Sequence, residues 1–142
     1  THGFRGEPMY PILKDYLLPI TDQTLPTLVE DLEERGLLET TLLVWVGEFG
    51  RSPRINNIAG RDHWPRAFSN IWAGGNIQTG GVIGATDRRG EDVIERPCGP
   101  HDFLATIYHH LGISRETTFE DQTGRPQYVL PPDQGQVIRE LL

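Results

Sequence analysis

Apolar residues between Leu25 and Leu32 recur at positions i, i+3, i+4 and i+7, and charged residues fill the opposite face. This spacing predicts an amphipathic α-helix. Asp22 is the expected N-cap of the helix, and Gly36 its expected end. A shorter helix is predicted to begin at about Pro11, because proline is tolerated in the first turn of a helix.

The next apolar run, residues 40–46, is short, and its apolar positions do not alternate with polar ones. That pattern favours a parallel strand that is covered on both faces. A helix, a short loop and a buried strand in this order form an α/β unit. Ligands of such sheets bind beyond the carboxyl ends of the strands, which places residues 47–51 at the expected site.

The rest of the chain carries weaker patterns, separated by glycine and proline. The glycine-rich turns serve backbone geometry, since no phosphate-loop lysine accompanies them. Asp102 is the expected cap of a helix that Gly112 ends. The expected elements are strands at 68–73 and 80–85, a helix at 103–111, a short strand near 128–130 and a terminal helix near 136–142.

Composition narrows the class of protein. A chain of 142 residues is one domain or part of one, and its net charge of −7 argues against general nucleic-acid binding. No stretch approaches the roughly 18 apolar residues of a membrane span. Cys98 is the only cysteine, which excludes an intrachain disulfide and a cysteine-based zinc site. Of the 13 basic residues, all except Lys14 are arginines, which suit oxyanion recognition, although GC-rich coding produces the same bias.

Asp62 and His63 are the leading candidates for chemistry. A carboxylate oxygen and an imidazole nitrogen are both ligands of divalent metals, and this pair follows the buried strand. The alternative is an aspartate that caps a turn and a histidine that is hydrogen-bonded near Trp64. Residues 47–66 also hold four arginines against two carboxylates, a local positive excess that suits a phosphate or sulfate ester. These arginines are Arg51, Arg54, Arg61 and Arg66.

Other candidates are weaker. Glu48 lies at the end of the expected central strand, where it either faces a cofactor or pairs with Arg51 or Arg54. His101 precedes the capping Asp102 and either faces the site or is solvated. His109 and His110 lie within a predicted helix and receive no role. Cys98 is interpreted as a packing residue, and no serine or threonine lies in a nucleophile elbow.

Several motifs follow one another in a fixed order along the chain. They are Leu-Glu-Glu-Arg-Gly-Leu at 32–37, Thr-Leu-Leu-Val-Trp-Val-Gly-Glu-Phe-Gly-Arg-Ser-Pro at 41–53, Gly-Arg-Asp-His-Trp at 60–64, Gly-Gly-Val-Ile-Gly-Ala-Thr-Asp at 80–87, and His-Asp-Phe-Leu-Ala-Thr-Ile at 101–107 followed by Leu-Gly-Ile at 111–113. Together they resemble an uncharacterised bacterial family, domain of unknown function 1501. The resemblance covers about residues 1–140 and implies a sulfatase-like member of the alkaline phosphatase superfamily. The implied fold is α/β, a three-layer sandwich with a mostly parallel sheet and metals at the strand ends, of which residues 1–142 would be the C-terminal portion.

The resemblance assigns roles residue by residue. Asp62 and His63 look like the metal-binding pair of the superfamily, although Glu48 occupies the strand end where sulfatases hold that pair. His2 would be the surviving ligand of a Trp-Asp-Thr-His motif, and His101 a more distal ligand. The superfamily's nucleophile belongs to the first half of the fold and is expected upstream of this chain. Many relatives have a histidine before a C-terminal glycine, but here that position is a glutamine, so no ligand is implied there.

These expectations combine into one hypothesis and two alternatives. The chain would be part of a metal-dependent hydrolase of phosphate or sulfate esters, with Zn, Ca or Mn held by the residues above and the substrate oriented by Arg51 and Arg61. One alternative is a non-catalytic relative that binds an anionic polysaccharide or a protein partner. The other is a purely structural network of arginines and carboxylates at 47–66. The resemblance further implies a periplasmic or secreted protein, and a missing N-terminal half that covers the sheet edge.

Overall fold

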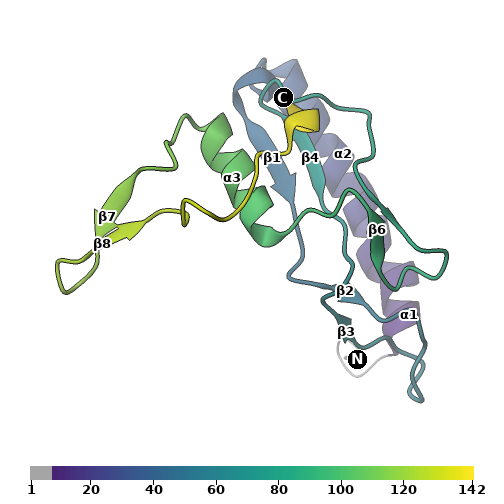
Figure 1. The fold of residues 1–142 in the computed structure, drawn as a ribbon. Helices are drawn as coiled ribbons and strands as arrows, with labels where there is room; N and C mark the ends of the chain where they lie inside the picture. The colour runs from purple at the N-terminus through teal and green to yellow at the C-terminus, as the bar shows by residue number, and fades with distance from the viewer. Residues whose placement is uncertain (1–7) are drawn as a thin grey trace. The chain divides into compact units, whose positions relative to one another are not determined.

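The computed structural model describes residues 8–142 of a chain that divides into two compact units, Thr1–Glu95 and Arg96–Leu142. The first unit contains helices α1 and α2 and three small ladders, and the second contains helix α3 and one hairpin (Figure 1). None of the helices in the described part of the chain is long and apolar enough to cross a membrane.

One continuous helical rod opens the first unit (Figure 1). It consists of α1 (Met9–Ile12), the π-helical turn η1 (Leu13–Leu17) and α2 (Leu18–Glu34). Pro19 follows the π turn and lacks an amide hydrogen, which removes one donor from the helical ladder where the helix widens. The prediction that Asp22 is an N-cap is wrong, because the helical segments continue past this residue and it lies inside α2.

The end of α2 follows the sequence prediction. Gly36 adopts φ +67°, a left-handed conformation that glycine tolerates best. Its amide donates to the carbonyl of Glu33 at 2.9 Å, and the amide of Leu37 donates to the carbonyl of Leu32 at 2.8 Å. This pair of bonds is the Schellman motif, which satisfies carbonyls that the helix leaves open. The 3₁₀ turn η2 (Leu38–Thr40) then leads into the first strand.

The expected strand at 40–46 is present as β1 (Leu42–Trp45), but its pairing differs from the prediction. It pairs antiparallel with β4 (Ile71–Gly74), with Leu42 opposite Gly74. No parallel ladder occurs among residues 8–142, and the second edge of β1 has no partner strand within them. An apolar run indicates burial on both faces, but it does not encode which strand lies beside it.

Two smaller ladders complete the first unit. Strand β2 (Gly50–Arg51) pairs with β3 (His63–Trp64), and β5 (Ala85–Thr86) pairs with β6 (Val93–Glu95). The strand expected at 80–85 forms only at its end. Gly80 and Gly84 have φ values of +82° and +83°, which an extended strand cannot contain.

The second unit is built around α3 (Pro100–His110), which begins three residues earlier than expected. Asp102, expected as the N-cap, is instead the third residue of the helix, and Gly99 is the N-cap. The Oδ2 of Asp102 accepts a hydrogen bond from the amide of Gly99 at 2.7 Å, so its carboxylate still supports the first turn. Gly112 ends the helix at φ +69°, where the amide of Ile113 bonds to the carbonyl of Tyr108 at 2.8 Å. The hairpin that follows pairs β7 (Thr118–Glu120) with β8 (Pro126–Tyr128).

The buried apolar side chains of the described residues all belong to this second unit. Thr106, also buried, donates to the carbonyl of Asp102 at 2.7 Å and accepts from the amide of Ile138 at 2.9 Å, which fastens the C-terminal segment to α3. The terminal helix expected at 136–142 is reduced to the 3₁₀ turn η3 (Arg139–Leu141). The buried apolar side chains are Ala105, Leu130, Ile138 and Leu141.

Candidate functional site

The loop that carries the Asp-His pair is closed at its base by Ser52 and Asp62. The amide of Ser52 donates to the carbonyl of Asp62 at 2.9 Å, and the amide of Asp62 donates to Oγ of Ser52 at 3.0 Å. The Ser52 hydroxyl then donates to the carbonyl of Arg54 at 2.8 Å. Ser52 is buried and its side-chain bonds are part-buried, so they are partly shielded from water and fix the start and end of the loop together.

Asn56 organises the loop and orients the carboxylate. Its Oδ1 accepts from the amides of Ile58 and Gly60, at 3.2 and 2.9 Å. Its Nδ2 donates to Oδ1 of Asp62 at 3.0 Å. The Asp62 side chain is nevertheless exposed, so one carboxylate oxygen is fixed by Asn56 while the group remains open to solvent.

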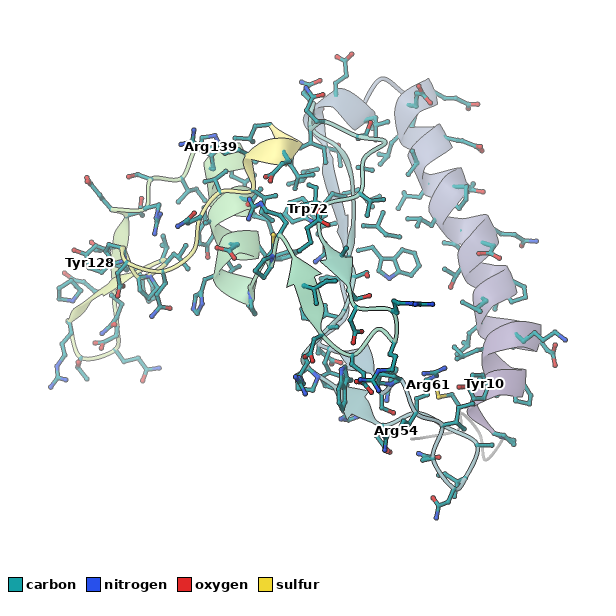
Figure 2. All side chains as sticks on the ribbon, turned by 45° about the vertical axis from the view of Figure 1, so that its right-hand side comes forward. Tyr10, Arg54, Arg61, Trp72, Tyr128 and Arg139 are labelled. Carbon is teal, nitrogen blue, oxygen red and sulfur yellow. The ribbon has the colours of Figure 1, made fainter. Side chains whose placement is uncertain are left out.

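Arg61, expected to bind substrate, braces the loop. Its Nη1 donates to the carbonyl oxygens of Ser52 and Pro53, at 2.7 Å each, and its Nε donates to the hydroxyl of Tyr10 at 2.7 Å. Figure 2 shows the Arg61 and Tyr10 side chains meeting between the loop and the first helix. These three bonds occupy two of the three guanidinium nitrogens. Arg61 therefore supports the position of the Asp-His turn, and only Nη2 is left for the expected substrate contact.

His63 and Arg51 lie opposite each other in the β2–β3 ladder and share the ring of Phe49. The His63 ring centroid is 4.1 Å from that of Phe49, with the ring planes tilted by 36°. The Arg51 guanidinium carbon lies 5.8 Å from the Phe49 centroid, within the range of a cation–π contact. The structure thus places His63 and Arg51 on one aromatic residue, a contact that the sequence analysis did not predict.

The other predicted ligands are more scattered. Glu48 is exposed between β1 and β2 and forms no side-chain hydrogen bond or ion pair with residues 8–142, so the expected pairs with Arg51 or Arg54 are not made. His101 is exposed in the first turn of α3, in the second unit. His2 lies outside the described residues.

The donors present do not by themselves make a complete metal site. Within residues 8–142, no three side chains of His, Cys, Asp or Glu gather closely enough to hold an ion. Asp62 contacts Asn56 and His63 contacts Phe49, so the adjacent pair has different neighbours. Zinc takes about four ligands and calcium about six to eight. Further donors must therefore join this pair for a metal to bind.

A second set of contacts joins the residues that follow the Asp62–His63 pair to the β5–β6 hairpin. The sequence analysis did not predict these contacts. Nε1 of Trp64 donates to the carbonyl of Glu91 at 2.7 Å, and Arg66 forms an ion pair with Asp92. The hairpin loop is held by Asp87, whose carboxylate accepts from the amide of Glu91 at 2.8 Å. This bond is the main reason why the pKa of Asp87 is lowered. The partners of Trp64 and Arg66 lie far along the chain from them, which no local pattern specifies.

Cys98 is exposed, so the packing role expected for it is not confirmed, but its thiol is not activated as a nucleophile either. Loss of solvation raises the pKa of its thiol, and this outweighs the opposing effect of the nearby Arg96 charge. A raised pKa keeps the sulfur protonated at neutral pH, whereas a nucleophilic cysteine needs the thiolate.

The described chain is a protein of helices and two-stranded antiparallel sheets, and it carries an exposed Asp62–His63 pair flanked by arginines. The chain belongs to the family described as "Protein of unknown function (DUF1501)", whose profile matches residues 12–142. No curated protein and no solved structure matches the chain.

Proposed function

We propose that this chain is the C-terminal portion of a metal-dependent hydrolase of phosphate or sulfate esters, related to the sulfatases. The proposed fold of the whole protein is the three-layer α/β sandwich of the alkaline phosphatase superfamily. In that fold β1 would lie inside a larger sheet, and its second edge has no partner strand among residues 8–142. The proposed location, by the same resemblance, is the periplasm or the outside of the cell.

The observation that carries the proposal is the construction of the Asp62–His63 turn. Part-buried bonds at Ser52 and the three bonds of Arg61 fix the backbone, while both side chains of the pair remain exposed. A functional group that is held by a supporting network loses little freedom when it binds a ligand. A turn that served only to connect β2 and β3 would not need this support.

The charges around the turn suit an anionic substrate. Arg51 and Arg54 are exposed and form no ion pair with any residue of the described part. Their guanidinium groups can therefore offer paired donors to a phosphate or sulfate group. They would attract the ester to the turn, while Asn56 keeps the Asp62 carboxylate in position.

A divalent cation, Zn, Ca or Mn, would complete the proposed site. When bound, it would supply Lewis-acid chemistry at the ester oxyanion. Asp62 and His63 would contribute two ligands, and Glu48, His2 and His101 are the remaining candidates in this chain. Because the described donors do not form a complete site, the other ligands and the nucleophile are proposed to come from a preceding part of the same fold.

Metal content of the protein purified from its complete gene tests the proposal. Elemental analysis should find a stoichiometric divalent metal in the wild type, and a clear loss in the double variant Asp62→Ala, His63→Ala. The matched control is Asp133→Ala with His109→Ala, two exposed residues of the second unit, which should retain the metal. Equal metal content in all three proteins would remove Asp62 and His63 from the metal site.

A second candidate function follows from the uncommitted arginines. Without a group of three metal ligands in residues 8–142, Arg51 and Arg54 would bind an anionic polysaccharide or protein partner without turnover. Retention on immobilised sulfated polysaccharide should then fall for Arg51→Gln with Arg54→Gln, but not for Arg35→Gln, an exposed arginine at the end of α2. Turnover of aryl phosphates or sulfates with added zinc, calcium or manganese would instead favour the hydrolase.

A further inference from the structure

The second unit contains a cleft that the proposed hydrolase site does not use. It has a volume of about 420 Å³, large enough for a small polar group with its bound water. Three of its lining residues are arginines and one is a glutamate, in a chain whose net charge is −7. The lining residues are Arg96, Arg115, Gln136, Val137, Arg139 and Glu140.

Arg96 is held rigidly at this cleft. Its Nε and Nη2 donate to the two carboxylate oxygens of Glu140, at 2.6 and 2.9 Å. Its backbone has φ +44°, a left-handed conformation that non-glycine residues rarely adopt. Such a conformation persists only where surrounding contacts enforce it, and it is common at ligand sites. The remaining nitrogen, Nη1, makes only a long contact of 3.8 Å to the sulfur of Cys98.

Arg115 is fixed from another direction. Its Nη2 donates to the carbonyl oxygens of Pro132 and Gln134, at 2.8 and 2.6 Å. Its Nε and Nη1 form no hydrogen bond with residues 8–142, so two of its donor nitrogens stay available. A guanidinium anchored by one nitrogen keeps its plane and its charge in place while the others can bind a ligand.

Arg139 supplies the third cation. It is the first residue of η3, and Figure 2 shows it at this C-terminal turn. Its side chain is exposed and forms no ion pair within the described part of the chain. Glu140 balances the charge of Arg96 only, so the charges of Arg115 and Arg139 remain unbalanced at the cleft.

We propose that this cleft binds a phosphate or sulfate group. Two guanidinium groups are fixed before binding and the third is free to close over the ligand, which suits a compact tetrahedral dianion. A purely structural role would explain the bonds of Arg96 and Arg115, but it leaves Arg139 without a function. The proposal does not depend on the Asp62–His63 site, because every lining residue belongs to the second unit.

The experiment is a titration of the whole protein with inorganic phosphate and with sodium sulfate, at constant ionic strength, followed by calorimetry and by the NMR signals of arginine side chains. Saturable binding is expected, with shifts at Arg96, Arg115 and Arg139. Arg139→Gln should weaken it about tenfold, the loss expected for one charge-assisted contact. The matched control, Arg125→Gln, removes an equal charge from the hairpin of the same unit and should leave the affinity within about twofold.

Two further arms separate the possible outcomes. Titration with acetate should give weaker binding, because a monovalent planar carboxylate matches the two unbalanced charges less well. Binding should survive in the Asp62→Ala, His63→Ala variant, and its loss there would assign the anion to that turn instead. The proposal is overturned by the absence of saturable binding, or by equal affinities of the Arg139→Gln and Arg125→Gln proteins.

Discussion

At the scale of single residues, the ion pair of Arg96 and Glu140 changes the ionisation of both side chains. Hydrogen bonding to Arg96 lowers the pKa of the Glu140 carboxyl from its ordinary value of 4.5 to about 2. The same bonds raise the pKa of Arg96. A carboxyl whose folded pKa is lowered adds stability above its unfolded pKa and loses that contribution as the pH falls through the folded pKa.

Glu140→Gln should therefore lower the melting temperature at neutral pH. Its difference from the wild type should shrink as the pH falls from 4.5 to about 2, where Glu140 itself becomes protonated. Because both partners are partly exposed, the effect should be small and should weaken in high salt. Thermal melts across this pH range check it, with Glu116→Gln as the control. A difference that stays constant with pH would contradict the assignment.

The sequence names the candidate residues of the turn, but it does not predict their contacts. An Asp-His pair among arginines is recognisable in the sequence, and the structure places His63 and Arg51 on one aromatic ring. The bracing role of Arg61 was not predictable, because two of its partners are backbone carbonyls whose direction depends on the closed loop. A sequence shows an arginine in the same way whether its guanidinium binds a substrate or backbone carbonyls of the same chain.

At the scale of elements, glycines decide how closely the β1–β4 ladder approaches the preceding turn. Gly74 has φ +72°, and a Cβ at this position would meet the carbonyl of Thr41 and, at 2.8 Å, the carbonyl of Leu38. The amide of Gly75 donates to the Leu38 carbonyl at 2.7 Å, so η2 and the end of β4 are in direct contact. This contact leaves no room for a side chain.

Gly74→Ala should destabilise the protein by about 1–3 kcal/mol, through a clash with backbone and an unfavourable φ. Gly80→Ala is the matched control, because Gly80 also has a positive φ, +82°, but no atom lies within 4 Å of the place that its Cβ would take. Denaturant unfolding of both variants separates the steric effect from the conformational one. Equal losses of stability would show that the close approach does not matter.

Elements set by local rules were predicted well, and those set by distant partners were not. Gly36 and Gly112 end their helices as expected, since a left-handed glycine follows directly from the local backbone. The predicted start at Asp22 failed because α1, η1 and α2 continue into one another past it. In the β1–β4 ladder Leu43 lies opposite Ala73, a partner so far along the chain that apolar patterning does not encode it.

At the scale of the whole molecule, the two units differ in how much apolar surface they bury. The first unit has no fully buried apolar side chain among its described residues. In the β1–β4 ladder, Trp45 is 41% exposed and Ile71 is 51% exposed. Exposed apolar surface, together with a strand edge that has no partner among residues 8–142, is typical of a surface that another part of the protein covers.

The 142-residue chain produced alone should therefore bind a hydrophobic dye strongly and associate at moderate concentration. Dye fluorescence and light scattering measure this directly. The protein purified from its complete gene should show neither property if further residues cover the ladder. A monodisperse 142-residue monomer that melts cooperatively without dye binding would contradict the proposed incomplete sheet.

In the proposed function, Asp62 and His63 hold a divalent metal at one turn. Anomalous X-ray scattering from crystals of the protein purified from its complete gene, grown with zinc, calcium or manganese, tests this claim most directly. We expect a peak within bonding distance, about 2.0–2.6 Å, of the Asp62 carboxylate and the His63 ring. A metal bound elsewhere, with Asp62 still on Asn56 and His63 still on Phe49, would contradict it.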